Sequence, residues 1–542
     1  MTDTPATTPK VDDPADDCPP VGGRYAWYVL FVLVLVYVVN FVDRQILSIL
    51  AEDIKKDLGL TDTELGFLYG TAFAVFYALF GIPLGRLADN WVRTRLLSIG
   101  LTVWSGMTMV SGFATSFGQL TVARVGVGIG EASASPSAFS MISDWFPREK
   151  RATALAIYSS GLYIGGGVSL LIGALVVKAW NNAYPGGGPL GLVGWQAAFL
   201  AVGMPGLFLA IWVAFLKEPI RGRADGLPPP APVENIGRRF WDDLSSVLPP
   251  LTFFHIAQFG TTALLRNLAL AALVAGVAAA LIALTGDVPQ WVALGIGAYA
   301  VASWAQSLKE RDPPTFALIW GTPTFVLAIV AFGSISFKGY ALGFWTVPYA
   351  IRTFVTPVVE AGGTLPWYGT TEFIALTLGG MAAVGGFLGV VLGGAMSDKI
   401  KGAHAGGRIL VATLSTLVPV PFMFLMFTTD SLAMLYLYNL GPALFGSIYV
   451  GIAAATTQDL VLPRMRGAAT ATYFIGTTMI GLGLGPYFAG KISKVTGDLG
   501  TGILSLLVAA PLTLLCLYLV WRKLPAAEAS RLERARAAGE PI

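Results

Sequence analysis

The chain has 542 residues, of which 55% are hydrophobic and 12% charged, with a formal net charge of +3. A soluble domain carries about twice that share of charged residues. With two cysteines and two histidines, the composition excludes a disulfide framework, a cysteine metal site and a histidine proton relay. Apolar stretches of about 20 residues recur from end to end, so the sequence predicts an all-α polytopic membrane protein.

The N-terminal part begins with a polar tail. Residues 1–20 are rich in Pro, Asp and Thr and are predicted to be disordered. They lack the basic and short apolar regions of a cleaved signal peptide, so the first apolar run is predicted to be a retained span. Residues 21–218 form a predicted N-terminal lobe with six spans: Trp27–Ala51, Leu65–Ala88, Leu96–Ala114, Gln119–Ile142, Thr153–Val177 and Gln196–Leu216.

The middle of the chain combines a linker with two further apolar runs. Residues 219–250 contain a Pro-Pro-Pro run and several charges, and are predicted to be a cytoplasmic linker. Within residues 251–313, Asn267–Gly286 and Val288–Leu308 are uncharged and long enough to span. We interpret them as an inserted transmembrane hairpin, because a pair of spans keeps the second half in the same orientation. The alternative is a pair that lies at the interface or packs as a soluble insert.

The C-terminal half repeats the six-span pattern. Residues 314–523 are predicted to form the second lobe and residues 524–542 a cytoplasmic tail, which gives about 14 spans in all. The second-lobe spans are Thr322–Val355, Phe373–Met396, Ile409–Phe427, Leu432–Thr457, Ala468–Ile492 and Ile503–Trp521. Basic residues gather in alternate connections, which predicts two cytoplasmic termini and a location in the inner (plasma) membrane.

Two matched segments show that the chain is built twice. Gly85-Arg-Leu-Ala-Asp89 and Gly394-Ala-Met-Ser-Asp398 each end an apolar run and precede a basic stretch. Asp144-Trp-Phe-Pro-Arg-Glu-Lys-Arg151 is echoed by Asp459-Leu-Val-Leu-Pro-Arg-Met-Arg466. Internal repeats in such a hydrophobic chain are typical of secondary transporters.

These motifs resemble a known family. The segment from Gly85 to Arg95 resembles the signature between spans two and three of the major facilitator superfamily, and Arg124 to Ala132 resembles its span-four motif. Gly161 to Gly167 resembles the Gly-rich span-five motif. The resemblance implies two six-helix lobes with pseudo-two-fold symmetry, alternating access and a monomer. Asn90 and Val92 depart from the signature, which usually has a basic residue and Gly there.

Some details are similar to the spinster branch, which transports sphingolipids and lysophospholipids. They are Asn40-Phe-Val-Asp43-Arg44, Gly128-Ile-Gly-Glu131-Ala-Ser133 and Trp91-Val-Arg93. An Asp-Arg pair in span one also occurs in organic-anion symporters of the superfamily. The inserted hairpin is not a general spinster feature.

Charged residues inside the first lobe's spans are the candidates for chemistry, because burying a charge in a membrane is costly. Asp43 and Glu131 are predicted proton-coupling residues, with Asp43 preferred. Arg44 and Arg124 are predicted to bind an anionic headgroup, since guanidinium suits phosphate and carboxylate. Arg124 and Glu131 are seven positions apart, on one face of a helix. The alternative is a pair of salt bridges that only hold spans one and four together.

The second lobe carries fewer buried charges. Lys338 lies among aromatic residues, and the predicted substrate-binding set in this lobe is Lys338, Tyr340, Phe344 and Trp345. A cavity that is polar on one wall and aromatic on the other would match an amphipathic substrate. The alternatives are aromatic residues that pack against lipid or helices, and a Lys338 that reaches an interface.

A third set lies at predicted cytoplasmic helix ends. Asp89, Arg93, Asp144, Arg151 and Asp398 are predicted conformational-gating residues, which the resemblance places in an inter-lobe charge network that stabilises the outward-open state. A topogenic or helix-capping role is the alternative for the individual basic residues.

The sequence therefore predicts a proton-coupled secondary transporter of an amphipathic, anionic, lipid-like substrate. Its predicted partners are that substrate, protons and membrane lipids, with no nucleic acid, metal or cofactor. A small organic-anion symporter and a drug–proton antiporter are the alternatives. The chain carries no nucleotide-binding motif or Gly-x-Ser-x-Gly elbow, so ATP-driven transport and a membrane-embedded enzyme are disfavoured.

Overall fold

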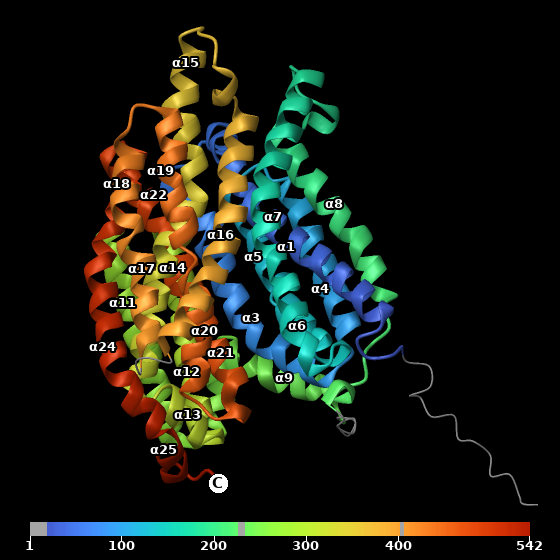
Figure 1. Ribbon diagram of the computed structural model, residues 1–542, viewed down its shortest axis with the longest axis vertical. Coiled ribbons are helices and arrows are strands. Elements are labelled where there is room, and N and C mark those ends of the chain that lie inside the picture. The colour runs from blue at the N-terminus through green and yellow to red at the C-terminus, as the bar shows by residue number, and fades with distance from the viewer. Residues whose placement is uncertain (1–18, 226–233, 402–405, 542) are drawn as a thin grey trace, which may run out of the picture.

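The computed structural model describes residues 19–225, 234–401 and 406–541, and these residues form helices that run mostly along the long axis of the molecule (Figure 1). Two helical lobes stand side by side. The predicted disorder of residues 1–20 falls almost wholly outside the described residues. Within the described part, ten helical stretches are long and apolar enough to cross a membrane.

The first lobe contains the six predicted spans, two of them as pairs of shorter helices. The second predicted span breaks at Gly70, where an added Cβ would lie 2.4 Å from the carbonyl oxygen of Leu482 in the other lobe. The fourth breaks after Glu131, since Pro136 has no N–H to donate to the carbonyl of Ala132. The elements are α1 (Arg24–Leu58), α2 (Asp62–Tyr69), α3 (Thr71–Asn90), α4 (Arg93–Ser111), α5 (Phe117–Glu131), α6 (Ala134–Trp145), α7 (Arg148–Ala183), η1 (Pro189–Gly191) and α8 (Gly194–Ala214).

The second lobe repeats this arrangement with more interruptions. Proline residues begin several of its helices, and two short π-helical segments, η3 and η6, interrupt its first and fifth spans. The elements are α14 (Pro323–Ala350), η3 (Ile351–Val355), α15 (Thr356–Glu360), η4 (Trp367–Gly369), α16 (Thr371–Lys401), α17 (Gly407–Leu417), α18 (Pro419–Thr428), α19 (Leu432–Phe445), α20 (Tyr449–Asp459), η5 (Pro463–Met465), α21 (Arg466–Gly476), η6 (Thr477–Gly483), α22 (Gly485–Thr496), α23 (Leu499–Leu504), η7 (Ser505–Ala509), α24 (Ala510–Ala529) and α25 (Arg531–Ala537).

Between the lobes the chain forms the two long helices of the predicted hairpin. Part of the predicted linker is also helical: α9 buries Leu244 and Val247 on α3 and exposes Arg238 and Trp241 on its other side. The predicted C-terminal tail is likewise helical in α24 and α25. The elements between the lobes are η2 (Arg223–Asp225), α9 (Ile236–Val247), α10 (Leu251–Ala257), α11 (Thr261–Thr285), α12 (Val288–Arg311) and α13 (Pro313–Ile319).

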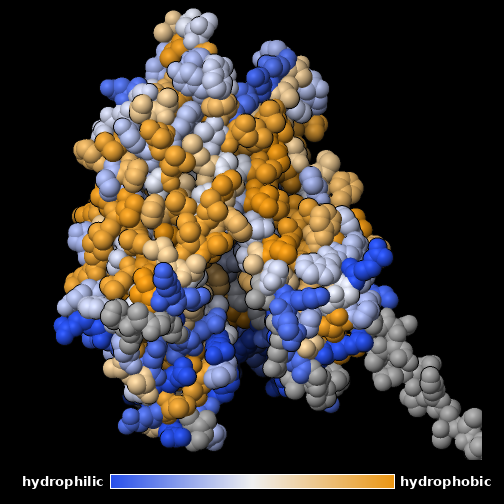
Figure 2. Space-filling model, viewed as in Figure 1, coloured by the Kyte–Doolittle hydropathy of each residue, from blue (hydrophilic) through white to orange (hydrophobic). Residues whose placement is uncertain are grey.

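The outer surface of the helices is apolar. Figure 2 shows hydrophobic residues along the middle of the molecule, and hydrophilic residues gathered mainly at its lower end. Large side chains such as Phe208 and Val391 are 68% and 53% exposed there. A surface of this kind is stable only against lipid tails, which agrees with a membrane protein.

The internal repeat is visible in matching ion pairs. In the first lobe Arg93 pairs with Asp144, and in the second lobe Arg408 pairs with Asp459; both pairs are 51 positions apart. Each joins the start of the third span of its lobe to the end of the fourth. The two sequence echoes therefore occupy equivalent positions in two related lobes.

The two ends of the molecule differ. We call the end that carries α9, α13 and α25 the linker end, and the opposite end, which carries α15, the α15 end (Figure 1). Toward the linker end the surface is hollowed between the lobes (Figure 2). Toward the α15 end the lobes meet closely, and added Cβ atoms at Gly66 and Gly490 would lie 2.4 and 2.2 Å from backbone oxygens of the other lobe.

Candidate transport site

An ion pair inside the first lobe joins α1 to α5. Arg44 donates to Glu131 with an N–O distance of 2.6 Å, and both side chains are almost fully buried. The guanidinium lies over the rings of Phe41, Phe73 and Tyr77 at 4.7, 4.4 and 5.2 Å from their centroids. Such cation–π contacts are strengthened when the cation is desolvated. The sequence reasoning predicted the two charged residues but not their aromatic surroundings, although Phe41 precedes Arg44 by one helical turn.

Asp43 lies on a different side of α1 from Arg44, because adjacent residues of a helix point about 100° apart. Its side chain is fully buried, and neither carboxylate oxygen has a hydrogen-bond partner among the described residues. The polar residues that act on its carboxylate include Glu131, Arg124 and Thr108. Arg124 donates to the backbone oxygen of Asp43 at 3.2 Å, while its Nε and second terminal nitrogen have no partner within the described residues.

The four predicted first-lobe residues therefore form one cluster with two parts. Arg44 and Glu131 share one ion pair and keep one buried polar atom each without a partner among the described residues, whereas both carboxylate oxygens of Asp43 and two guanidinium nitrogens of Arg124 have none there. A buried polar atom without a hydrogen-bond partner destabilises the folded protein, so such atoms are expected where water or a ligand binds. Next to Arg44, Gln45 donates to the carbonyl of Gly343 in the second lobe at 2.6 Å, so the cluster lies beside the contact between the lobes.

Lys338 is held by hydrogen bonds within the second lobe. Its ammonium donates to the carbonyl oxygens of Ser415 and Thr416 on α17, at 2.9 and 3.4 Å, and a small pocket beside it is lined by α14, α17 and η7. The Ser415 carbonyl is free to accept because Pro419, four residues on, has no N–H. Lys338 thus lies within the second lobe and does not join the first-lobe cluster.

The three predicted aromatic residues of the second lobe lie in two different surroundings. Phe344 stacks on Tyr69 of the first lobe at 4.4 Å, and the Trp345 indole donates to the carbonyl of Pro486 at 2.9 Å. Both are fully buried; Phe344 contacts the first lobe, whereas the hydrogen bond of Trp345 stays within the second lobe. Tyr340 is only half-buried and lies beside Gly481 of η6. Of the three, only Tyr340 remains partly accessible.

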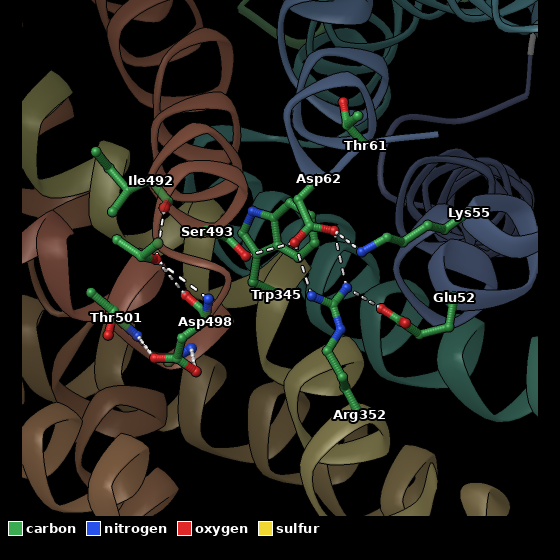
Figure 3. Close-up of polar contacts among 12 residues, drawn as sticks. Glu52, Lys55, Thr61, Asp62, Trp345, Arg352, Ile492, Ser493, Asp498 and Thr501 are labelled. Carbon is green, nitrogen blue, oxygen red and sulfur yellow. Dashed lines mark hydrogen bonds and ion pairs between the residues drawn. The ribbon is translucent and has the colours of Figure 1, made fainter. Parts of the chain in front are cut away.

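A second cluster of charges joins the lobes at the α15 end (Figure 3). Arg352 of η3 donates to both carboxylate oxygens of Asp62 at 2.8 and 3.0 Å, and to Glu52 at 2.7 Å. Lys55 and Ser493 donate to the same Asp62 carboxylate, each at 2.6 Å. We call Glu52, Lys55, Asp62, Arg352 and Ser493 the α15-end cluster. It links α1 and α2 of the first lobe to η3 and α22 of the second.

The sequence reasoning missed the α15-end cluster. Two signals could have found it. Arg352 is a charge inside the predicted span Thr322–Val355, where charges are functional candidates. Thr61-Asp-Thr-Glu64 has the pattern of a capping box, which the structure contains, and it fixes Asp62 at the start of α2.

Comparison with known proteins agrees with this architecture. The family model of the Major Facilitator Superfamily matches residues 33–365, more than half of the chain. The chain belongs to the Major Facilitator Superfamily. It is therefore a transporter and not an enzyme.

Relatives within the superfamily have varied names. An MFS-type efflux pump of Mycolicibacterium smegmatis is 27% identical over 90% of each chain. Protein spinster of Drosophila melanogaster is 28% identical over 38% of this chain and 32% of the relative. A probable L-galactonate transporter of Escherichia coli is 31% identical over 34% of this chain and 37% of the relative.

A solved structure has the same fold. A bacterial homologue of the human lysosomal transporter spinster, in an inward-facing and unoccupied conformation, is similar with a TM-score of 0.63. It is 24% identical and covers 94% of this chain and 98% of the other. The predicted major facilitator fold is thereby confirmed.

Within the residues that the structure describes, the ion pairs of the predicted gating residues do not join the two lobes. Arg93 is fully buried and donates to Glu218 at 2.6 Å and to Asp144, while Arg151 pairs with Asp225 at 3.1 Å. These pairs join the first lobe to itself and to the segment that follows it. Asp89 and Asp398 are exposed at the linker end. The predicted inter-lobe network is absent among these contacts because the lobes are apart at this end.

Proposed function

We propose that this protein is a proton-coupled secondary transporter of an amphipathic, anionic, lipid-like molecule, and that it works by alternating access. The observation that carries the proposal is the first-lobe cluster of Asp43, Arg44, Arg124 and Glu131. In it, two buried carboxylates lie with two guanidinium groups, and Asp43 has no hydrogen-bond partner in the described part of the chain. An ionised carboxylate in such a place is expensive, whereas its protonated form carries its own donor.

The ion pair of Arg44 and Glu131 can couple substrate binding to proton uptake. An anionic headgroup that binds Arg44 competes with Glu131 for the same guanidinium. Glu131 then loses its ion pair with Arg44 and is stabilised by taking up a proton. We assign proton exchange to Asp43 first and to Glu131 second, and headgroup binding to Arg44 and Arg124.

The rings around Arg44 favour an amphipathic substrate. Phe41, Phe73 and Tyr77 surround the guanidinium with apolar surface, and Tyr340 supplies a half-buried aromatic ring from the second lobe. A headgroup at Arg44 would leave the rest of the molecule beside aromatic side chains. We place the linker end in the cytoplasm, because its basic residues satisfy the positive-inside rule, with the protein a monomer in the inner membrane.

A second candidate is transport of a small organic anion such as a sugar acid. The L-galactonate transporter among the relatives favours it, since the buried guanidinium groups suit any carboxylate. A drug–proton antiporter is a third, in view of the efflux pump that matches nearly the whole chain. The three differ in the substrate that moves and share the proton step.

The test is proton movement in proteoliposomes that contain a pH-sensitive dye. Lysophospholipids, sphingoid phosphates, sugar acids and cationic drugs are added in turn to wild type, Asp43→Asn and Glu131→Gln, with the exposed Asp430→Asn as a matched control. We expect a lysolipid-driven pH change that Asp43→Asn abolishes and Asp430→Asn retains. Substrate flux without proton movement in any variant would disprove proton coupling. A response to sugar acids or drugs alone would replace the substrate class.

A further inference from the structure

The inserted hairpin lies along the contact between the two lobes. Its second helix, α12, packs against α3 of the first lobe and η6 of the second. Gly297 is the closest point: an added Cβ would lie 3.1 Å from Val75 on α3 and 2.6 Å from Met479 on η6. The absence of a side chain at this position lets α12 touch both lobes at once.

Gln290 forms a polar junction at the same contact. It is 1% exposed, and its carboxamide oxygen accepts from the Thr71 hydroxyl of α3 at 2.7 Å. Its nitrogen donates to the Gly483 carbonyl of η6 at 3.4 Å, and the same carbonyl lies 2.5 Å from the Thr71 hydroxyl, whose single proton is shared between Gln290 and Gly483. Three elements, one from each lobe and one from the hairpin, therefore meet in one set of hydrogen bonds.

Asp287 adds a charged contact at the turn between α11 and α12. Its carboxylate accepts from the Lys491 ammonium and the Tyr487 hydroxyl of α22, each at 2.7 Å. Lys491 also donates to the Thr285 carbonyl, and the ring of Trp291 packs edge-on against Tyr487 at 5.6 Å. The turn of the hairpin is thus fixed to the second lobe at the level of the α15-end cluster.

The linker end of the hairpin is fixed as well. The α9 helix, which leads into the hairpin, packs on α3 and pairs with it through Asp243 and Arg86. At the other end Asp312 pairs with Arg464 of the second lobe at 2.8 Å. The first helix, α11, packs mainly on α10 and α12 and buries only Ala263 and Asn267. Contact with the lobes is therefore concentrated in α12.

We propose that the hairpin is a clamp that favours the conformation closed at the α15 end, and that Asp287 and Gln290 are positioning residues for it. This rests on the proposed alternating access. If the lobes part at the α15 end, α3 moves away from η6 and α22, and α12 cannot keep its contacts with both. Among the lobe helices the hairpin packs mainly on α3, so opening would separate Asp287 from α22 and Gln290 from Gly483 of η6, and these contacts therefore stabilise the closed form relative to the open form.

The test measures the two conformations directly in the full chain. Spin labels on Leu190→Cys and Val495→Cys, both exposed at the α15 end, report the separation of the lobes in a Cys18→Ser, Cys516→Ser background reconstituted in lipid nanodiscs. Asp287→Asn, Gln290→Ala and Lys491→Met are compared with Gln306→Ala. Gln306 is the matched control, because its hydrogen bonds go to Asn267 and Ala263 within the hairpin.

We expect Asp287→Asn, Lys491→Met and Gln290→Ala each to raise the ratio of open to closed populations about fivefold to tenfold. Gln306→Ala should leave that ratio unchanged. If the first three behave as Gln306→Ala does while wild type still opens at altered pH, the clamp is disproved and alternating access stands. If no condition opens the α15 end in any variant, alternating access fails and the clamp with it. Lys491→Met tests the same contact from the lobe, should Asp287→Asn fail to fold.

Discussion

The α15 end and the linker end use the same kind of interaction for different purposes. At the α15 end Arg352 joins the second lobe to Asp62 and Glu52 of the first. At the linker end Arg93 and Arg408 are more deeply buried than Arg352, and each pairs within its own half of the chain. Ion pairs between lobes must break when the lobes separate, whereas pairs inside a lobe can persist.

The role of an ion pair therefore depends on whether it lies within one lobe or joins the two lobes. The within-lobe pairs hold each lobe as a rigid unit, and the α15-end cluster selects one arrangement of the two units. Substitutions at the two ends should therefore separate effects on folding from effects on conformation.

The largest effect is expected at the linker end, on stability. Arg93→Met leaves the carboxylates of Asp144 and Glu218 without their buried guanidinium, which should cost about 3 kcal/mol in the free energy of unfolding. Thermal unfolding in detergent measures it. Arg86→Met removes a pair whose arginine is 44% exposed and serves as control, with an expected loss below about 1 kcal/mol. Equal losses would contradict the distinction between buried and exposed pairs.

The next effect is expected at the α15 end, on conformation. Arg352→Met removes every hydrogen bond from η3 to Asp62 and Glu52, so the closed form should lose about 2 kcal/mol relative to the open form. Distances between spin labels across the lobes measure the shift. Lys178→Met also breaks an inter-lobe pair, with Glu372, but Lys178 is 56% exposed and its loss should change little. An unaltered distance distribution in Arg352→Met would show that the cluster does not select the closed form.

A third pair of substitutions tests the close backbone contact between the lobes and changes no charge. In Gly70→Ala the new methyl group would lie 2.4 Å from the Leu482 carbonyl, so the closed form should lose about 1–2 kcal/mol. Gly81→Ala on α3 meets nothing within 4 Å and should be neutral or slightly stabilising. Cross-linking of cysteines across the α15 end measures closure. Faster cross-linking in Gly70→Ala than in wild type would exclude steric hindrance at this contact.

The smallest effect concerns Asp312 at the linker end and its dependence on pH. The hydrogen bonds from Arg464 lower the pKa of Asp312 to about 2. A carboxylate with a lowered pKa in the folded state adds stability above its ordinary pKa of about 4, and that stability is lost as the pH falls toward 2. Because Arg464 is 47% exposed, Asp312→Asn should cost less than about 1 kcal/mol at pH 7 and nothing at pH 2. Unfolding measured at both pH values checks it, and a loss that persists at pH 2 would contradict it.

The transport cluster was partly predictable. Asp43, Arg44, Arg124 and Glu131 stand out because charges within apolar spans are rare. That Arg44 pairs with Glu131 while Arg124 donates to the backbone of Asp43 depends on how α1 and α5 are rotated in the packed lobe. The contacts of Lys338 with α17 were not predictable for the same reason, because a charge in a span does not indicate which neighbouring helix it faces.

The sequence by itself determined the helices, the repeat, the inserted hairpin and the family, because apolar length, charge placement and glycine-rich motifs are local properties of the chain. Only the tertiary structure decided which charges meet. Asp62 and Arg352 are 290 positions apart and Asp62 and Ser493 are 431 apart, and no local pattern records such separations. It also decided which end is closed, because two lobes of similar construction can rock either way. The difference lies in a few contacts between them, including those of the α12 helix.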